Sequence, residues 1–257
     1  MTDYLYAPPS VADDYDSPWK IALEHYFEPF LSLLFPDIHS GVDWTRQPEF
    51  LDKELQQVAR EAALGRAEAD KVVRVWRHTG EEAWVVVHVE VQAQPARSFE
   101  QRMYTYNYRL FDRHARPVVS LAVLADDNPS WRPERYESRL WGCVAGLRFP
   151  TVKLWDYRER WGELERSDNP FAAVVMAHLQ AQATRKQPYE RYQWKLLLMR
   201  ALGKRGYGHQ NSKEIVEAVE WMLWLPDDLD QQLWTQLYEE EVHMPYVSRI
   251  ERVAREQ

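Results

Sequence analysis

Apolar residues recur every three or four positions through the last third of the chain, which is the spacing of one helix face. The segments with this spacing are residues 171–184, 189–202, 212–225 and 229–237. A polar residue and a proline, Asn169 and Pro170, precede the first segment, as at the start of many helices. The pattern predicts three or four packed helices. It also predicts two domains, at residues 1–166 and 167–257.

Before that boundary the pattern of apolar positions is mixed. Residues 50–64 carry apolar side chains on one helical stripe, and Gly65 follows them, as is typical of a helix end. The turn-like sequence RHTGEE lies between residues 70–76 and residues 83–92. In both segments apolar side chains either alternate with polar ones or follow one another without interruption. These two segments predict a β-hairpin.

A helix and a buried strand are expected directly after the hairpin. Ser98, with Gln101 three positions later, forms a capping box for a helix that extends to about His114. Residues 117–125, PVVSLAVLA, are an apolar run long enough for one buried strand. A helix between two buried strands indicates a crossover and hence a mixed sheet. The predicted fold class is α/β, of the α+β kind, with helices flanking a central hairpin.

The hairpin suggests a pair of opposed carboxylates. Turning about Gly80, it would pair Trp76 with Trp84 and Asp70 with Glu90. Directly opposed side chains have Cβ atoms about 4.5 to 5.5 Å apart, so the two acids would repel one another unless a cation lay between them. Oxygen ligands suit Mg²⁺ or Mn²⁺, which can activate water for attack on a phosphate. The alternative is a solvated hairpin end with a slipped register and ordinary surface acids.

Composition and charge limit the classes of protein. The chain has 257 residues, of which 45% are apolar, and a single cysteine, Cys143, so it has no internal disulfide. We find no stretch typical of a signal peptide or a membrane span, and expect a cytoplasmic protein without membrane contact. The formal net charge of −8 argues against coating of nucleic acid by bulk charge.

The charge is unevenly distributed along the chain. Residues 185–205 hold seven bases and one acid, whereas residues 214–241 hold nine acids and no base. The basic stretch is compatible with a nucleic-acid backbone, and equally with pairing to the acidic helices that follow it. Both interpretations remain open at the level of sequence.

Several segments, in order, resemble a known superfamily of nucleases. They are DSPWK, DKELQQV, the hairpin with HVEVQ at its end, RMYTYNYRLFDR and RFPTVKLWDYRERW. Together they resemble the PD-(D/E)XK nucleases and, within them, the bacterial recombination-promoting nuclease and transposase-like group. The resemblance covers about residues 17–156. It implies a restriction-endonuclease-like core and a DNA endonuclease that hydrolyses phosphodiester bonds with Mg²⁺ or Mn²⁺.

The resemblance also implies roles for individual residues. Asp70 takes the place of the motif aspartate and Glu90 that of the second acid, and Glu54 matches an acid that many members add from a helix. The Val91 carbonyl would complete the metal site. Gln92 stands where the motif has lysine, so it can orient a water but brings no positive charge.

The helix at residues 98–114 offers candidates for DNA contact. Arg102, Tyr106, Arg109 and Arg113 follow one helical stripe, and arginine with interleaved tyrosine suits phosphate contact and base stacking. The alternative is an amphipathic helix with solvated arginines and tyrosines packed on the sheet. His88, on the carboxylate face of the hairpin, is either an aid to proton transfer or a packed histidine.

Two further functions compete with the nuclease. One is a degenerate member of the family that binds or regulates without cleaving, which the missing lysine suggests. The other is an assembly protein that forms homo-oligomers through its aromatic C-terminal helices. The 12 tryptophans beside paired acids would also suit a glycosidase. However, Trp194, Trp221 and Trp224 lie in helix-periodic apolar segments, where packing explains them better.

Overall fold

The computed structural model of the chain describes residues 16–51, 53, 71–90, 98–204, 213–240 and 242. The chain divides into two compact units. We call Tyr26–Glu159 the sheet unit, and Met1–His25 together with Arg160–Gln257 the helical unit. The sequence places a boundary at residue 166, whereas the helical unit begins at residue 160 and also includes the N-terminal helix.

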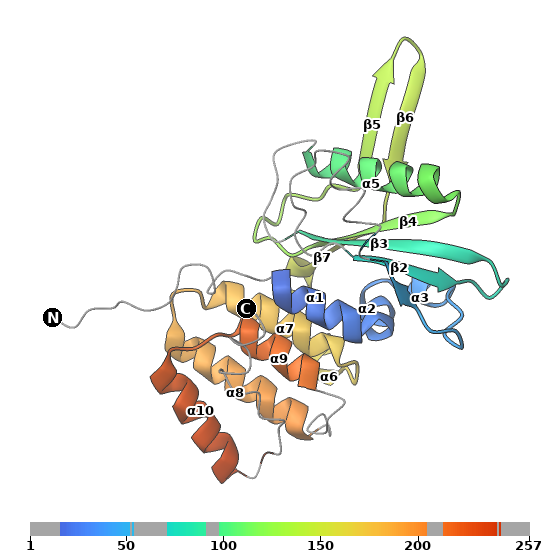
Figure 1. Ribbon diagram of the computed structural model, residues 1–257. Coiled ribbons are helices and arrows are strands. Elements are labelled where there is room, and N and C mark those ends of the chain that lie inside the picture. Colours follow the sequence, from blue (N-terminus) through green and yellow to red (C-terminus); the bar gives the residue numbers. More distant parts are fainter. Residues whose placement is uncertain are drawn as a thin grey trace. The chain divides into compact units, whose positions relative to one another are not determined.

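The sheet unit is built on a five-stranded mixed sheet (Figure 1). Its strands, in spatial order, are β1 (Glu49–Phe50), β2 (Lys71–Trp76), β3 (Glu82–Glu90), β4 (Val118–Leu124) and β7 (Thr151–Lys153). β1, β2 and β3 pair antiparallel, while β3, β4 and β7 pair parallel. Parallel strands need a crossover connection, which helix α5 (Ser98–His114) provides between β3 and β4. The predicted helix, buried strand and mixed sheet are therefore confirmed.

Helix α5 packs along one face of this sheet, and its contact residues recur at helical spacing. The buried positions on α5 are Phe99, Met103, Tyr106 and Leu110. They meet two groups of buried residues on the strands, one around Val72, Trp84 and Val86 and one around Ala122 and Leu124. Helices α2 (Phe27–Leu34) and α3 (Pro36–His39) lie on the other side of the sheet (Figure 1). The sheet is thus covered on both faces, as parallel strands require.

The hairpin of β2 and β3 has a different register from the predicted one. Trp76 pairs with Glu82 and not with Trp84, and Lys71 pairs with Val87. Each β2 residue therefore pairs two positions earlier on β3 than predicted. A shift by two preserves the face on which each side chain lies, because strand side chains alternate with period two. The apolar alternation therefore predicted the faces, whereas the assumed turn at Gly80 misplaced the pairs.

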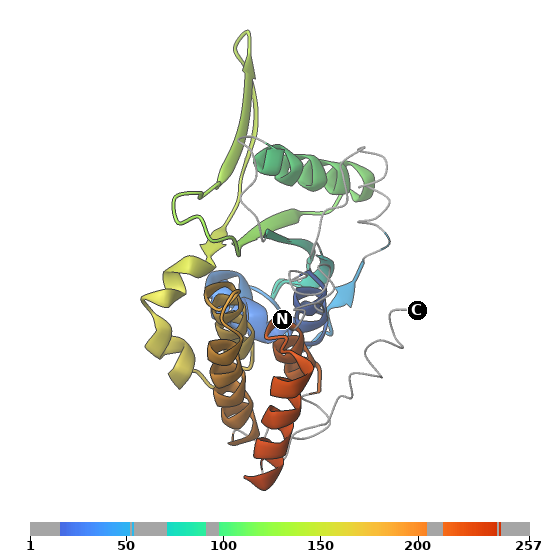
Figure 2. The ribbon, with the colours of Figure 1, turned by 90° about the vertical axis from the view of Figure 1, so that its left-hand side faces the viewer.

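A second, separate hairpin follows β4. It consists of β5 (Arg135–Leu140) and β6 (Cys143–Arg148), which pair only with each other. We call residues 135–148 the arm hairpin, and it projects beyond α5 (Figure 2). A short 3-10 helix, η1 (Leu154–Arg158), follows β7 and ends the sheet unit. The sequence pattern predicted neither the arm hairpin nor β7.

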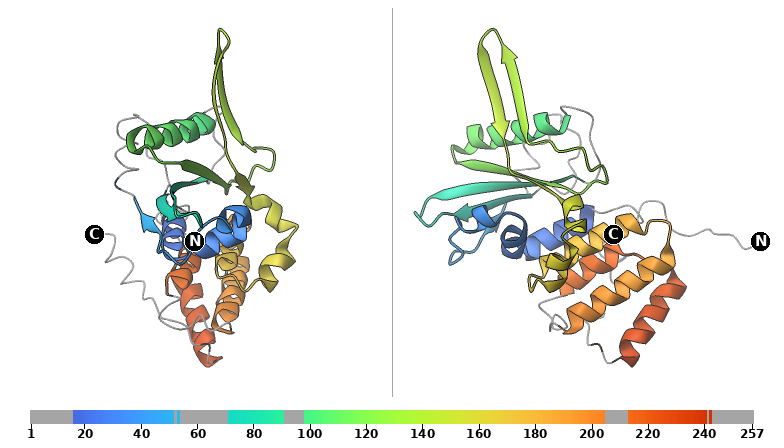
Figure 3. Two further views of the ribbon diagram at one scale, coloured as in Figure 1. Left: turned by 90° about the vertical axis from the view of Figure 1, so that its right-hand side faces the viewer. Right: turned by 180° about the vertical axis from the view of Figure 1, so that it is seen from behind.

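The helical unit contains six described helices (Figure 3). They are α1 (Asp16–His25), α6 (Trp161–Arg166), α7 (Phe171–Ala183), α8 (Pro188–Lys204), α9 (Lys213–Met222) and α10 (Asp227–Glu239). The last four match the four predicted segments. At the start of α7, the Asn169 Oδ1 atom accepts a hydrogen bond of 2.8 Å from the Phe171 backbone N–H, as the polar residue before Pro170 suggests. In the described part of the chain, no helix combines the length and apolar character needed to cross a membrane.

Candidate functional site

The three parallel strands end together at one edge of the sheet. Glu90, the last residue of β3, pairs with Leu124, the last residue of β4, and Leu124 pairs in turn with Lys153, the last residue of β7. These three positions form one row across the strands. Ligands of open α/β sheets bind beyond the carboxyl ends of the strands. We therefore treat this carboxyl edge as the candidate site.

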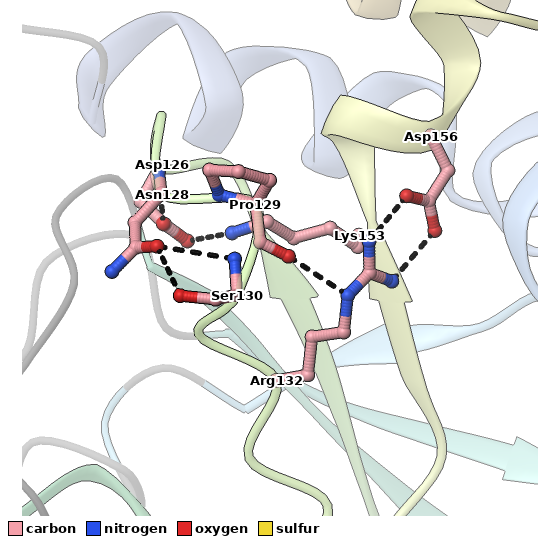
Figure 4. Close-up of polar contacts among 7 residues, drawn as sticks. All are labelled: Asp126, Asn128, Pro129, Ser130, Arg132, Lys153 and Asp156. Carbon is pink, nitrogen blue, oxygen red and sulfur yellow. Dashed lines mark hydrogen bonds and ion pairs between the residues drawn. The ribbon is translucent and has the colours of Figure 1, made fainter.

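An acid and a base meet in the interior at this edge. Lys153 Nζ lies 2.5 Å from the Asp126 Oδ2 atom, and the two side chains are only 2% and 1% exposed (Figure 4). The other oxygen of Asp126 accepts a hydrogen bond of 2.9 Å from the Asn128 backbone N–H. The ammonium group also lies 5.8 Å from the centre of the Trp131 ring. The pair is thus enclosed by polar and aromatic partners.

Burial makes this ion pair costly as well as strong. Removing two charges from water carries a desolvation penalty that their attraction only partly offsets, so a buried pair is weak evidence for stability alone. Desolvation lowers the pKa of Lys153 below its usual value, although the hydrogen bond to Asp126 acts in the opposite direction. A charged group that is buried at the carboxyl edge despite its desolvation penalty is a candidate for a functional role.

The loop after β4 is fixed in place around the pair. Asn128 Oδ1 accepts hydrogen bonds from the backbone N–H and the hydroxyl of Ser130. Arg132 donates two hydrogen bonds to the Asp156 carboxylate, of 2.8 and 2.5 Å, and a third to the Pro129 carbonyl (Figure 4). This bidentate pair connects the loop to η1, so the loop that carries Asp126 is held at both ends.

The residues predicted to hold a metal are mostly not described. Glu54, Asp70, Val91 and Gln92 lie outside the described residues, and for Glu90 only the backbone position is described. Among the residues whose side chains are described, no group of three or more His, Cys, Asp or Glu forms a metal-ligating cluster. The predicted opposition of Asp70 and Glu90 depended on a hairpin register that is wrong for every described pair.

The helix residues predicted to contact DNA occupy different environments. Tyr106 is fully buried and stacks on His88 with ring centres 5.3 Å apart. Its ring is therefore used for packing on the sheet, which was the alternative interpretation, and has no exposed face for a base. Arg102 and Arg109 are half-buried beside it, with the Arg102 guanidinium over the Phe99 ring, and Arg113 is exposed. The structure places the arginines on the flanks of the buried stripe.

His88 is a packed histidine in the sheet unit. It is fully buried between the strands and α5, against Tyr106, and pairs with Ala122 across the parallel strands. A fully buried ring offers no surface for contact with a phosphate. The alternative interpretation as a core residue is therefore the one that its position favours.

Two bases of the basic stretch, Lys195 and Arg200, pair with acids of the helical unit. Lys195 is 2% exposed and lies 2.9 Å from Asp230 and 3.7 Å from Glu220. Arg200 forms a bidentate pair with Glu240 on α10. These contacts favour the interpretation that the basic stretch pairs with the acidic helices.

Sequence reasoning missed Asp126 and Lys153. Asp126 comes two residues after the buried run of β4, where the carboxyl edge of a parallel strand is expected, and that position was a usable signal. Lys153 lies in the short strand TVK, whose three residues are too few for a periodic pattern.

Comparisons with protein-family models, curated proteins and solved structures found no match for the chain.

Proposed function

We propose that the chain is a metal-dependent DNA endonuclease of the recombination-promoting type, with a restriction-endonuclease-like core and its catalytic site at the carboxyl edge of β3, β4 and β7. The observation that carries the proposal is the row of Glu90, Leu124 and Lys153, which sets the predicted catalytic acid two strands from a buried lysine. Adjacent strands lie about 4.8 Å apart, so the two backbone positions are separated by roughly 10 Å.

The start of β2 supports the same location. Because β2 runs antiparallel to β3, its first residue, Lys71, lies near the end of β3. It pairs with Val87, which is three positions before Glu90. Asp70 directly precedes Lys71 in the sequence. The shifted register of the described pairs leaves β2 beginning at this edge. Of the two motif acids, Glu90 ends β3 at this edge, and Asp70 precedes β2 in the sequence.

The donors match a hard divalent cation. The carboxylates of Asp70 and Glu90, with Glu54 and the Val91 carbonyl, would supply only oxygen ligands, which Mg²⁺ and Mn²⁺ prefer. Asp126 is not assigned to this set, because its two oxygens already accept hydrogen bonds from Asn128 and Lys153. When bound, the metal would activate water and neutralise charge that develops on the phosphate.

The residues of the chain itself would position and stabilise the reacting groups. Gln92 would orient the attacking water, as an amide can both donate and accept. Lys153 and Asp126 form a pair without net charge, which would hold the loop after β4 in place beside the metal. The positive potential that Gln92 does not supply would come from the bound metal.

The test is nicking of supercoiled plasmid with Mg²⁺ or Mn²⁺. We expect Asp70→Asn to lose activity by a factor of at least about 100, as expected when a metal ligand or its charge is removed. Asp112→Asn, which changes an exposed acid on α5, is the matched control and should nick like the wild type.

Equal nicking by the wild type and Asp70→Asn, or by neither with any metal, would contradict the proposal. Calorimetric titration with Mn²⁺ then separates the remaining possibilities. Binding that depends on Asp70 without cleavage would indicate a degenerate family member that binds but does not cut. Absence of binding would leave the fold as a scaffold, with no metal function at this edge.

A further inference from the structure

The arm hairpin is a two-stranded sheet that no other strand of the described residues joins. Its two strands pair only with each other, so both edges present unpaired backbone groups. An isolated two-stranded hairpin is at best marginally stable in water. Only its base is supported, where Tyr136 stacks on Tyr104 of α5 with ring centres 5.0 Å apart. The remainder projects from the sheet unit (Figure 3).

The tip of the arm hairpin exposes large apolar side chains. Trp141 is 97% exposed, and Leu140 and Val144 beside it are 63% and 56% exposed. Burial of such side chains stabilises an ordinary fold, so three of them in solvent forgo a substantial stabilisation. Alternation places Leu140 and Val144 on opposite faces of the arm hairpin, so its tip exposes apolar surface on both faces, which indicates an interaction site.

The backbone at the tip indicates that the tryptophan is there for its side chain. Trp141 and Gly142 have φ angles of +49° and +82°, the left-handed pair of a type I′ turn. Glycine, asparagine and aspartate adopt this conformation readily, whereas a bulky aromatic residue rarely does. The turn would therefore form more easily without Trp141, and strain of this kind is found at functional positions.

The charge of the arm hairpin identifies the kind of partner. Residues 135–148 contain three arginines and one acid, Glu137, in a chain whose net charge is −8. Arg135 and Arg148 pair directly across the strands, and Glu134, which precedes the arm hairpin, lies 3.8 Å from Arg148. Alternation places Arg139 on the same face, opposite Val144. The arm hairpin is thus a basic ribbon with an aromatic tip.

We propose that the arm hairpin is a DNA-binding arm that lies in a groove of duplex DNA. Arg135, Arg139 and Arg148 contact the phosphates, and Trp141 stacks on or between bases at the tip. A two-stranded ribbon fits a DNA groove, and apolar side chains act as wedges between base steps. This inference rests on the proposed nuclease function, to which it adds the surface that engages the substrate.

Tyrosines on α5 extend this surface toward the sheet unit. Tyr104 and Tyr108 lie with ring centres 5.7 Å apart, and Tyr104 in turn stacks on Tyr136 of β5. Tyr108 is 44% exposed, in contrast to Tyr106 on the buried face of the same helix. Partly exposed aromatic rings beside arginines suit contact with nucleic acid.

The test measures binding of the full chain, in EDTA, to a fluorescein-labelled DNA duplex of roughly 30 base pairs, about three helical turns. Trp141→Asn removes the wedge and retains a residue that suits the turn, so we expect no loss of thermal stability. Binding should weaken by about 5- to 100-fold, the range found for one stacked aromatic. Trp141→Phe should retain most of the affinity, because phenylalanine is also a wedge.

The arginines are tested by the salt dependence of the same binding. Replacing Arg135, Arg139 and Arg148 together by glutamine should reduce the slope of log affinity against log salt by roughly 2 to 3, about 0.9 for each phosphate contact. Arg77→Gln is the matched control, since Arg77 pairs with Glu81 on the other hairpin as Arg139 pairs with Glu137. Its slope should equal that of the wild type.

Cys143 reports directly on the position of the DNA. It is the only cysteine of the chain and lies exposed beside the tip, so alkylation by iodoacetamide has a single target. The duplex should slow this alkylation. Unchanged alkylation, or unchanged affinity of both the Trp141→Asn and the triple arginine variants, would overturn the proposal.

Three further outcomes are informative, and the last two separate this inference from the proposed endonuclease. If light scattering shows a dimer that Trp141→Asn converts to a monomer while DNA affinity is unchanged, a second copy of the chain covers the tip and the arm proposal is wrong. If nicking depends on Asp70 but the arm variants bind DNA normally, only the arm proposal fails. Binding that depends on the arm, without nicking, would instead retain the arm and overturn the endonuclease.

Discussion

Lys153 and Asp126 hold opposite charges at a depth where neither side chain meets solvent. They are 27 positions apart in the sequence, and they meet because β4 and β7 are parallel neighbours. No local pattern marks such a pair, since each residue alone resembles a surface charge next to a strand. By contrast, the burial of Tyr106 follows from helical spacing with Phe99, Met103 and Leu110, once α5 is known to pack on the sheet.

Removing one member of the buried pair should destabilise the sheet unit strongly. Lys153→Met leaves the Asp126 carboxylate buried without its cation, and we expect a loss of about 3 to 5 kcal/mol in the free energy of unfolding. Urea denaturation followed by circular dichroism measures it. Asp126→Asn combined with Lys153→Met should recover part of the loss, because no unpaired charge then remains inside.

Arg132→Gln is the control for this prediction. It breaks the neighbouring pair with Asp156, whose side chains are 48% and 44% exposed, so solvent already weakens the interaction. A loss equal to that of Lys153→Met would show that the buried pair has no special cost.

The elements differ in how completely their sequences specify them. Helices α7 to α10 follow their periodic patterns closely, because a helix closes its hydrogen bonds within its own segment. The hairpin of β2 and β3 has the predicted faces, but its register is displaced by two positions. Pairing between strands depends on the turn geometry and on both partners, whereas the face of a residue depends only on alternation.

Engineered disulfides distinguish the two registers. In a Cys143→Ser background, cysteines at Val75 and Ala83 occupy directly paired positions and should cross-link readily on mild oxidation. Cysteines at Val75 and Val85, the pair expected from a turn about Gly80, are diagonal neighbours too far apart to bridge without backbone movement. Gel mobility without reductant provides the measurement. Faster cross-linking of the cysteines at Val75 and Val85 would support the register predicted from the sequence.

At the scale of the whole molecule, the helical unit draws on both ends of the chain. Helix α1 packs against α9 and α7, with Trp19, Ala22 and Leu23 fully buried. Trp19 donates a hydrogen bond of 3.3 Å to His178 on α7. The uneven distribution of charge along the chain is also explained at this scale, since late acids such as Asp230 and Glu240 pair with bases of α8.

Truncation tests this division of the chain. A fragment of residues 1–159 carries α1 without its partners and should expose the apolar face that includes Trp19. A fragment of residues 26–159 lacks α1 and should self-associate less. Light scattering and binding of a hydrophobic dye compare the two fragments. Equal behaviour would show that α1 does not depend on residues 160–257 for burial.

The sequence by itself determined helices α5 and α7 to α10, the faces of the hairpin, the buried strand after α5 and the mixed character of the sheet. These features follow from local periodicity, which each segment carries independently of the others. The tertiary structure alone decided the register of β2 and β3, the inclusion of α1 in the helical unit, the row of Glu90, Leu124 and Lys153, and the projection of the arm hairpin. Each of these depends on contacts between segments distant in the chain. Such contacts form only when all the partners are folded, so they cannot be predicted from any single segment of the sequence.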